Sequence, residues 1–198
     1  MARTLLLWDA PNIDMTLSGV LNRRPSMNER PRFDVLGRWL VARARERGSD
    51  DVEACVFINV PVNDHGPMLG WVKVLLSIGF RVFAKPKMSD SDIDEDILGH
   101  MALRASDATD IIVASTDAEA FRVPLEEFAG RGASTTVLGF TEYSGGYSGS
   151  ERIAFVDLEE IPDLFNVPLP ARVRFDGLPM DGRWFEPSGN LSTLSGVA

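Results

Sequence analysis

Cysteine is almost absent from this chain, which contains one residue of that type, Cys55, among 198. A single thiol cannot form a disulfide within the chain, and it cannot build a cysteine-based zinc site. Cys55 lies in the apolar run 54–60, where a buried and unreactive thiol is the expected state. The sequence therefore indicates a protein of a reducing compartment, and we expect it to be cytoplasmic.

Long hydrophobic runs are also missing. No stretch approaches the ~20 consecutive apolar residues that a membrane-spanning helix needs. The apolar segment 4–8 near the N-terminus is too short for a signal peptide, and we predict that it enters a strand directly. We expect no membrane partner.

Basic residues are outnumbered, since 20 lysines and arginines face 29 acidic residues and the formal net charge is −9. This balance argues against general nucleic-acid binding. However, eight of the basic residues are arginines that fall between positions 23 and 47. They could form a local patch that meets phosphates, or they could be the solvated face of a helix and of the loop before it.

The fold class follows from short apolar runs that alternate with helical patterns. The runs predict strands near 4–8, 53–59, 80–84, 111–114 and 135–140. Continuous rather than alternating apolar strands are typical of parallel sheets that are buried on both faces. We therefore predict an α/β fold with a doubly wound, mainly parallel sheet of about five strands and helices on both faces.

Several local features carry separate expectations. Residues 10–32 contain three prolines and are predicted to be a long βα connection that is functional or holds a short helix. Asp34 is predicted to cap the next helix, and Pro124 to bend or interrupt the helix 118–130. The Gly/Ser-rich stretch 143–150 is predicted to be a mobile loop.

The predicted domain covers residues 1–165, and residues 166–198 read as an extended, proline-containing C-terminal tail. Trp184 and Phe185 could pack on the domain or contact a partner. Self-association or a protein partner through this tail is therefore a plausible expectation.

Two aspartates, Asp9 and Asp117, each follow a predicted buried strand. Ligand sites of α/β proteins lie outside the carboxyl ends of the strands, so both carboxylates are expected to face one crevice. An acidic run lies between them in the sequence, comprising Asp90, Asp92, Asp94, Glu95 and Asp96. Because Mg²⁺ prefers oxygen ligands, this pattern predicts a divalent-metal site.

The third ligand of that site is expected to be Asp94, with Asp92 as the alternative. Asn12 could orient a metal-bound water or hold the loop, and Asp14 could be an additional ligand. For Asp9 and Asp117 the plainer interpretation is a carboxylate that only caps a helix or forms a turn.

Other chemistries find less support in the sequence. The two histidines, His65 and His100, have no ligand-spaced partner, and no phosphate-binding glycine motif of a nucleotide hydrolase or dinucleotide-binding protein is present. A phosphatase that uses Asp9 as a covalent nucleophile is disfavoured, because its usual second acid would fall at Pro11.

Three segments resemble a known family, the NYN domains (LabA-like) of the PIN-like nuclease superfamily. The segment Trp8-Asp9-Ala10-Pro11-Asn12 is similar to the opening D-x-x-N element, and residues 115–121 are similar to the S-x-D-x-D-F element. The acidic stretch through Asp96 occupies the place of the central K-G-x-D-x-x-L motif, with Lys87 in the place of its lysine. The resemblance covers about residues 3–140.

This resemblance implies a metal-dependent ribonuclease that uses Mg²⁺ or Mn²⁺. Asp9, Asp94 and Asp117 would hold the metal, Glu119 would be an auxiliary ligand, and Asn12 and Ser115 would support them. The chain departs from the pattern at Glu119, where the family has aspartate, at the inserted Ala120, and in the missing glycine of the central motif.

The leading hypothesis is therefore a carboxylate-bound Mg²⁺ or Mn²⁺ site that hydrolyses RNA phosphodiester bonds. The alternative is a catalytically weak or inactive PIN-like module that binds RNA or a protein. The residues expected to contact the RNA backbone are Arg23, Arg24, Lys85 and Lys87.

Overall fold

The computed structural model describes residues 2–62, 66–88 and 92–172. Six strands form one sheet in the order β3-β2-β1-β4-β5-β6, and every neighbouring pair is parallel. The prediction of a doubly wound sheet is confirmed, with one strand more than the five expected. The strands are β1 (Arg3–Asp9), β2 (Asp51–Val60), β3 (Arg81–Pro86), β4 (Asp110–Ala114), β5 (Ser134–Gly139) and β6 (Ile153–Asp157).

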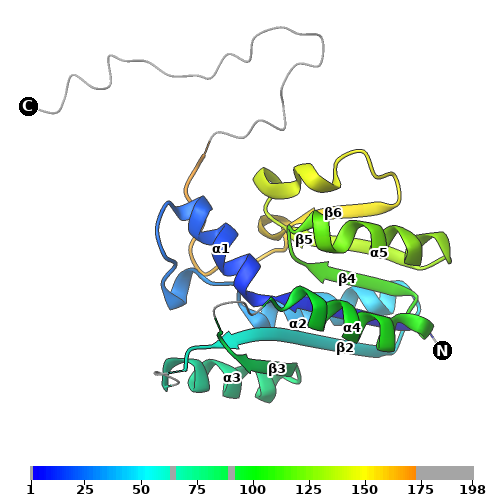
Figure 1. Cartoon of the computed structure of the whole chain (residues 1–198). Coiled ribbons are helices and arrows are strands. Elements are labelled where there is room, and N and C mark those ends of the chain that lie inside the picture. Colours follow the sequence, from blue (N-terminus) through cyan, green and yellow to red (C-terminus); the bar gives the residue numbers. More distant parts are fainter. Residues whose placement is uncertain (1, 63–65, 89–91, 173–198) are drawn as a thin grey trace, which may run out of the picture.

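Five α-helices connect the strands and cover both faces of the sheet (Figure 1). They are α1 (Ala10–Leu21), α2 (Phe33–Glu46), α3 (Gly66–Ile78), α4 (Asp94–Arg104) and α5 (Ala118–Gly130). Short 3₁₀ helices add η1 (Met27–Glu29), η2 (Ala105–Asp107), η3 (Thr141–Tyr147) and η4 (Leu158–Glu160). No helix within the described residues is long and apolar enough to cross a membrane.

Strand β1 shows how the two cores arise. Its side chains alternate between the faces of the sheet. Leu6 and Trp8 pack in one core with residues of α1, α2 and α3, whereas Leu5 and Leu7 pack in the other with residues of α4 and α5. A strand that is buried on both faces needs the continuous apolar sequence that predicted it.

The sheet order places β1 and β4 side by side at its centre, with Trp8 paired to Ala114 near their carboxyl ends. The chain runs outward from β1 through β2 to β3, then returns to the other side of β1 at β4. Doubly wound folds bind ligands at such a reversal, outside the carboxyl ends of the strands. Asp9 ends β1 at this edge, and Asp117 follows β4.

The connection after β1 holds a helix, which is one of the two expectations for residues 10–32. Helix α1 begins at Ala10, directly after the strand, because Asp9 accepts a hydrogen bond from the backbone N–H of Asn12 and so caps the helix. Pro11 lies in the first turn, where a missing N–H costs nothing. The cap predicted at Asp34 is displaced, since α2 begins at Phe33 and its N-cap residue is Arg32.

Two further expectations are corrected. Pro124 lies inside α5, which continues through it from Ala118 to Gly130 without a break. Most of the stretch predicted to be a mobile loop folds as η3, and Tyr147 at its end is buried in the core. The tail prediction is tested only as far as Arg172, which pairs with Glu142 and Glu159. Trp184 and Phe185 lie outside the described residues.

Candidate functional site

Asp9 is the most buried carboxylate of the predicted set, with 2% of its surface exposed. Its Oδ1 accepts the hydrogen bond from the N–H of Asn12 at 3.0 Å, and its Oδ2 accepts one from the hydroxyl of Ser115 at 3.0 Å. Desolvation outweighs these bonds and, with the charges of Asp117 and Asp92, raises the pKa of Asp9 to about 6. The carboxylate is thus held in a fixed orientation at an energetic cost.

Asp117 caps α5, since its Oδ1 accepts hydrogen bonds from the N–H groups of Glu119 and Ala120. Asp9 and Asp117 therefore both cap helices, as the plainer interpretation predicted. Every hydrogen bond described for the Asp117 side chain uses Oδ1, which leaves Oδ2 available to a cation. Capping and metal binding are compatible at this residue.

Asn12 ties the two strand ends together. Its side-chain Oδ1 accepts hydrogen bonds from the N–H of Thr116 at 2.9 Å and from the hydroxyl of Thr116 at 3.0 Å. Tyr147 closes the same region, because its hydroxyl donates to the carbonyl of Asp117 at 3.0 Å. Sequence reasoning anticipated a holding role for Asn12, but it missed Thr116, which stands at a variable position of the 115–121 element, and Tyr147, which lies outside every motif.

Asp94 reaches the group from the first turn of α4. Burial raises the pKa of its carboxyl group to about 7, and the negative charges of Asp9, Asp92 and Asp117 add to this effect. The charges of Asp9 and Asp117 act on Asp94, and the charge of Asp117 acts on Asp9, so these three side chains lie near one another. We call them the acid cluster. Asp92 is exposed, and its Oδ1 accepts a hydrogen bond from the N–H of Asp94 at 2.9 Å. Asp90 lies outside the described residues.

Two other predicted ligands lie elsewhere. Asp14 makes a bidentate ion pair with Arg30, with both N–O distances at 2.7 Å, and it is not among the charges that shift Asp9 or Asp94. Glu119 is exposed on the first turn of α5. The structure therefore groups the three main acids and leaves these two without a described role in the cluster.

A different group of possible metal ligands lies in the middle of the sheet. Among the described residues, one ligand atom each from Glu53, Cys55 and His100 lie within 4.8 Å of one another and could hold a metal ion. However, Glu53 already pairs with the guanidinium groups of Arg81 and Arg104. Burial also raises the pKa of the Cys55 thiol to about 12, so the group offers a protonated sulfur and a carboxylate that is already neutralised.

The arginine-rich segment is mainly a set of ion pairs. Arg23 pairs with Glu29. Further pairs within 4.0 Å link Arg30 to Asp14, Arg32 and Arg38 to Asp34, and Arg43 and Arg47 to Asp110. This favours the structural interpretation for most of the eight arginines. Among the RNA-contact candidates, Lys85 pairs with Asp96, whereas no ion pair is described for Arg24 or Lys87.

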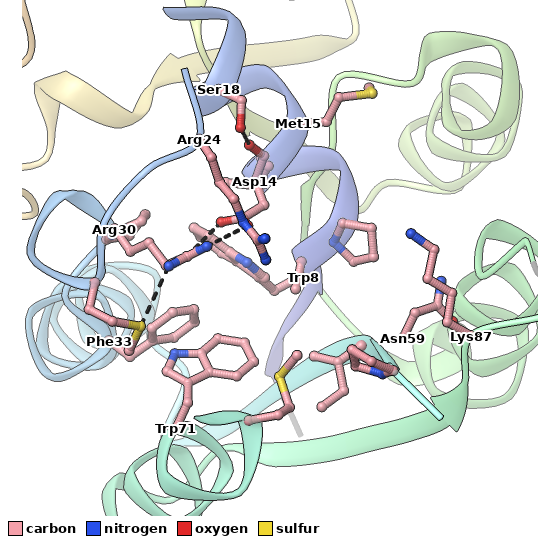
Figure 2. Close-up of a pocket in the computed structure, with 18 residues that line it drawn as sticks. Trp8, Asp14, Met15, Ser18, Arg24, Arg30, Phe33, Asn59, Trp71 and Lys87 are labelled. Atoms are coloured by element: carbon pink, nitrogen blue, oxygen red, sulfur yellow. Dashed lines mark hydrogen bonds and ion pairs between the residues drawn. The ribbon is translucent and has the colours of Figure 1, made fainter. Parts of the chain in front are cut away.

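Arg24 and Lys87 both line a cavity of about 520 Å³ (Figure 2). Trp8, Phe33 and Trp71 contribute aromatic surface, and Phe33 meets both tryptophans edge to face at centroid distances of 5.1 and 5.5 Å. We call this the aromatic cavity. No sequence pattern predicted this cavity, because its walls come from β1, α1, η1, α2, β2 and α3.

Comparisons with known proteins inform the fold. No family model matches the chain, and no curated protein matches it significantly. A solved structure that it resembles is a protein of unknown function from Vibrio parahaemolyticus, with a TM-score of 0.57 and 18% sequence identity over 79% of this chain and 93% of that one. The likeness supports the α/β architecture and says nothing about activity.

Proposed function

We propose that this protein is a metal-dependent ribonuclease whose acid cluster binds Mg²⁺ or Mn²⁺. The observation that carries the proposal is the convergence of Asp9, Asp94 and Asp117 from three separate elements at the carboxyl edge. Carboxylate oxygens are the ligands that these cations prefer. Neighbouring carboxylates repel one another, and burial makes their charges more costly. A bound divalent cation therefore stabilises such a site strongly.

The acid cluster offers the oxygen donors that such an ion prefers. Among the described residues its carboxylates do not form a group with ligand atoms within 4.8 Å of one another, so a cation would draw them together on binding. Oδ2 of Asp117 has no described hydrogen bond, and the raised pKa of Asp94 reflects charges that a cation would compensate. A bound divalent ion would lower the pKa of a water molecule and neutralise charge on the phosphate. Ser115 and Asn12 contribute by fixing the orientation of Asp9 and the end of β4.

The Glu53–Cys55–His100 group is the competing place for a metal. We favour the acid cluster because it lies at the strand ends, where substrate can enter, and because no arginine pairs with Asp9, Asp94 or Asp117 among the described ion pairs. RNA as the substrate rests on the resemblance of the motifs around Asp9 and Asp117 to NYN domains.

Cleavage of a panel of labelled single-stranded and structured RNAs tests the proposal. Purified protein is assayed with Mg²⁺, Mn²⁺ or EDTA, beside the Asp9→Asn/Asp117→Asn double variant, in which both asparagines can still cap their helices. We expect cleavage that EDTA and the double variant abolish. Absence of cleavage with retained RNA binding would refute the enzyme and favour the binding module.

A further inference from the structure

The aromatic cavity lies beside the acid cluster but on the other face of the sheet. Trp8 lines the cavity and its neighbour Asp9 belongs to the cluster, because consecutive residues of a strand point to opposite faces. Ala10 and Pro11, which begin α1, also line the cavity. A chain-like ligand that crosses the carboxyl edge can therefore occupy both places at once.

The cavity walls suit a flat aromatic group. Trp8 and Phe33 are buried and pack edge to face against each other, whereas Trp71 is partly exposed, and Met15, Met27 and Met68 complete the walls. The volume of about 520 Å³ lies within the range of roughly 300–1,000 Å³ that is typical of small-molecule sites. Nucleobases stack on aromatic side chains because every base has a π-face.

Two cations that line the cavity, Arg24 and Lys87, have no described ion pair. Both are exposed, so they can meet the phosphates that flank a bound base. Figure 2 shows Lys87 across the cavity from Trp71 and Phe33. Arg30, by contrast, is already held by Asp14.

We propose that the aromatic cavity binds one nucleobase of a single-stranded RNA, which stacks on Trp71. Arg24 and Lys87 contact the adjacent phosphates. The base must be unstacked to enter, which selects single strands over duplexes. The proposal rests on the proposed function and assigns a substrate class to it.

Binding is measured in EDTA, so that its outcome does not depend on cleavage. A labelled eight-nucleotide single strand and the same strand in a duplex are titrated with the Asp9→Asn/Asp117→Asn protein, and fluorescence anisotropy is recorded. We expect the single strand to bind more tightly than the duplex, because a paired base cannot enter the cavity. Equal affinity for the two would overturn the proposal.

Trp71→Ala tests the stacking surface, with Trp71→Phe as the conservative variant and Trp39→Ala as the control. Trp39 lies on α2 beside Arg43 and does not line the cavity. We expect Trp71→Ala to weaken binding about tenfold or more, as loss of one stacked base does. Trp71→Phe should restore most of the affinity. Unchanged binding by a folded Trp71→Ala protein would overturn the proposal.

Two exposed cations are tested without touching the aromatic packing. Arg24→Ala and Lys87→Ala should each reduce the dependence of log affinity on log salt concentration by about one unit. Arg45→Ala, an exposed arginine of α2 with no described ion pair, should leave it unchanged. An equal effect of Arg45→Ala would refute a specific role for Arg24 and Lys87.

Free AMP and CMP distinguish RNA from a mononucleotide ligand. We expect them to bind far more weakly than the oligonucleotides, since they lack the flanking phosphates. Equal affinity would assign the cavity to free nucleotides and overturn the RNA assignment. Cavity-dependent binding without any cleavage in Mg²⁺ would refute the nuclease alone.

Discussion

Oδ2 of Asp9 accepts a hydrogen bond from the hydroxyl of Ser115 at 3.0 Å, although the two residues are 106 positions apart in the chain. The two residues lie at the ends of adjacent parallel strands. Asp9 is the last residue of β1, and Ser115 is the first residue after β4. The bond is buried and joins the two halves of the doubly wound sheet at its switch point. It also fixes the orientation of the most buried acid in the cluster.

Neutralising Asp9 should stabilise the metal-free protein near neutral pH. Its pKa is about 6 in the folded chain against 3.8 for an ordinary aspartate, so the folded state holds a proton that the unfolded state has lost. The contribution of Asp9 to the free energy of unfolding is fully present below pH ~4. It decreases by roughly 2 kcal/mol or more as the pH rises through ~6. Asp9→Asn should remove this loss while keeping the helix cap.

Thermal unfolding of both proteins in EDTA between pH 4 and pH 8 measures this difference. Comparing wild type with Asp9→Asn cancels the titrating groups that do not interact with Asp9, such as His100, whose lowered pKa acts in the opposite direction. Asp94 does not cancel, because the charge of Asp9 helps to raise its pKa, so its contribution is part of the measured difference. Parallel pH profiles would contradict the assignment. Asp9→Ala serves as the control, because it removes the charge and also the cap, which costs about 1 kcal/mol.

Divalent cations should stabilise the protein more at pH 8 than at pH 6. Asp94, with its pKa raised to about 7, must lose a proton before it can bind a cation, so protons compete with the metal below that value. Thermal-shift titrations with Mg²⁺ and Mn²⁺ at both pH values give the measurement. Asp94→Asn should abolish most of the shift, and Asp92→Asn should retain it. The reverse result would assign the ligand to Asp92.

The Glu53–Cys55–His100 group should not contribute to the cation-induced thermal shift in the same titration. A Cys55→Ala/His100→Gln double variant is expected to show the wild-type response to Mg²⁺ and Mn²⁺. The thiol of Cys55 should not react with Ellman's reagent until the protein is unfolded, because it is fully buried and its pKa is raised to about 12. Loss of the cation response in the double variant would instead place the metal there.

Arg43 should be important for stability rather than for RNA binding. It makes a bidentate ion pair with Asp110, at 2.8 and 3.0 Å, and Asp110 is 1% exposed. Arg43→Ala leaves a buried carboxylate with only Arg47 nearby, at 3.6 Å, and should cost about 3 kcal/mol in urea unfolding. Arg38→Ala, which breaks an exposed pair with Asp34, should cost less than about 1 kcal/mol.

The sheet could be predicted because burial on both faces leaves apolar runs such as 4–8 and 111–114 in the sequence. For residues 10–32 a short helix was only one of two expectations, and the bounds of α1 were not predicted, although Ile13, Leu17 and Val20 have helical spacing and are all buried. Pro11 in a first turn permits a helix, and that distinction depends on recognising the cap at Asp9.

The site was only partly predictable for a related reason. Asp9 and Asp117 can be recognised in the sequence because each follows an apolar run that predicts a strand. The parallel arrangement of these strands brings the two residues to the same edge of the sheet. The aromatic cavity has no such signal, because Trp8, Phe33 and Trp71 come from segments that meet only in the tertiary fold. A count of charges also overestimated how many arginines are available to contact RNA, because a sequence does not show which arginines form ion pairs with acidic residues.

Strand β1 is made early by the ribosome, yet one of its two neighbours in the sheet is made late. Its pairing with β4 involves Asp110 and the residues after it, so a growing chain that has produced only β1, β2 and β3 holds half of the sheet. Such non-local pairing is slow to form. Ser115 cannot orient Asp9 until β4 has been made and has paired with β1. Pairing of β1 with β4 therefore completes the middle of the sheet and also orders the carboxylate of Asp9.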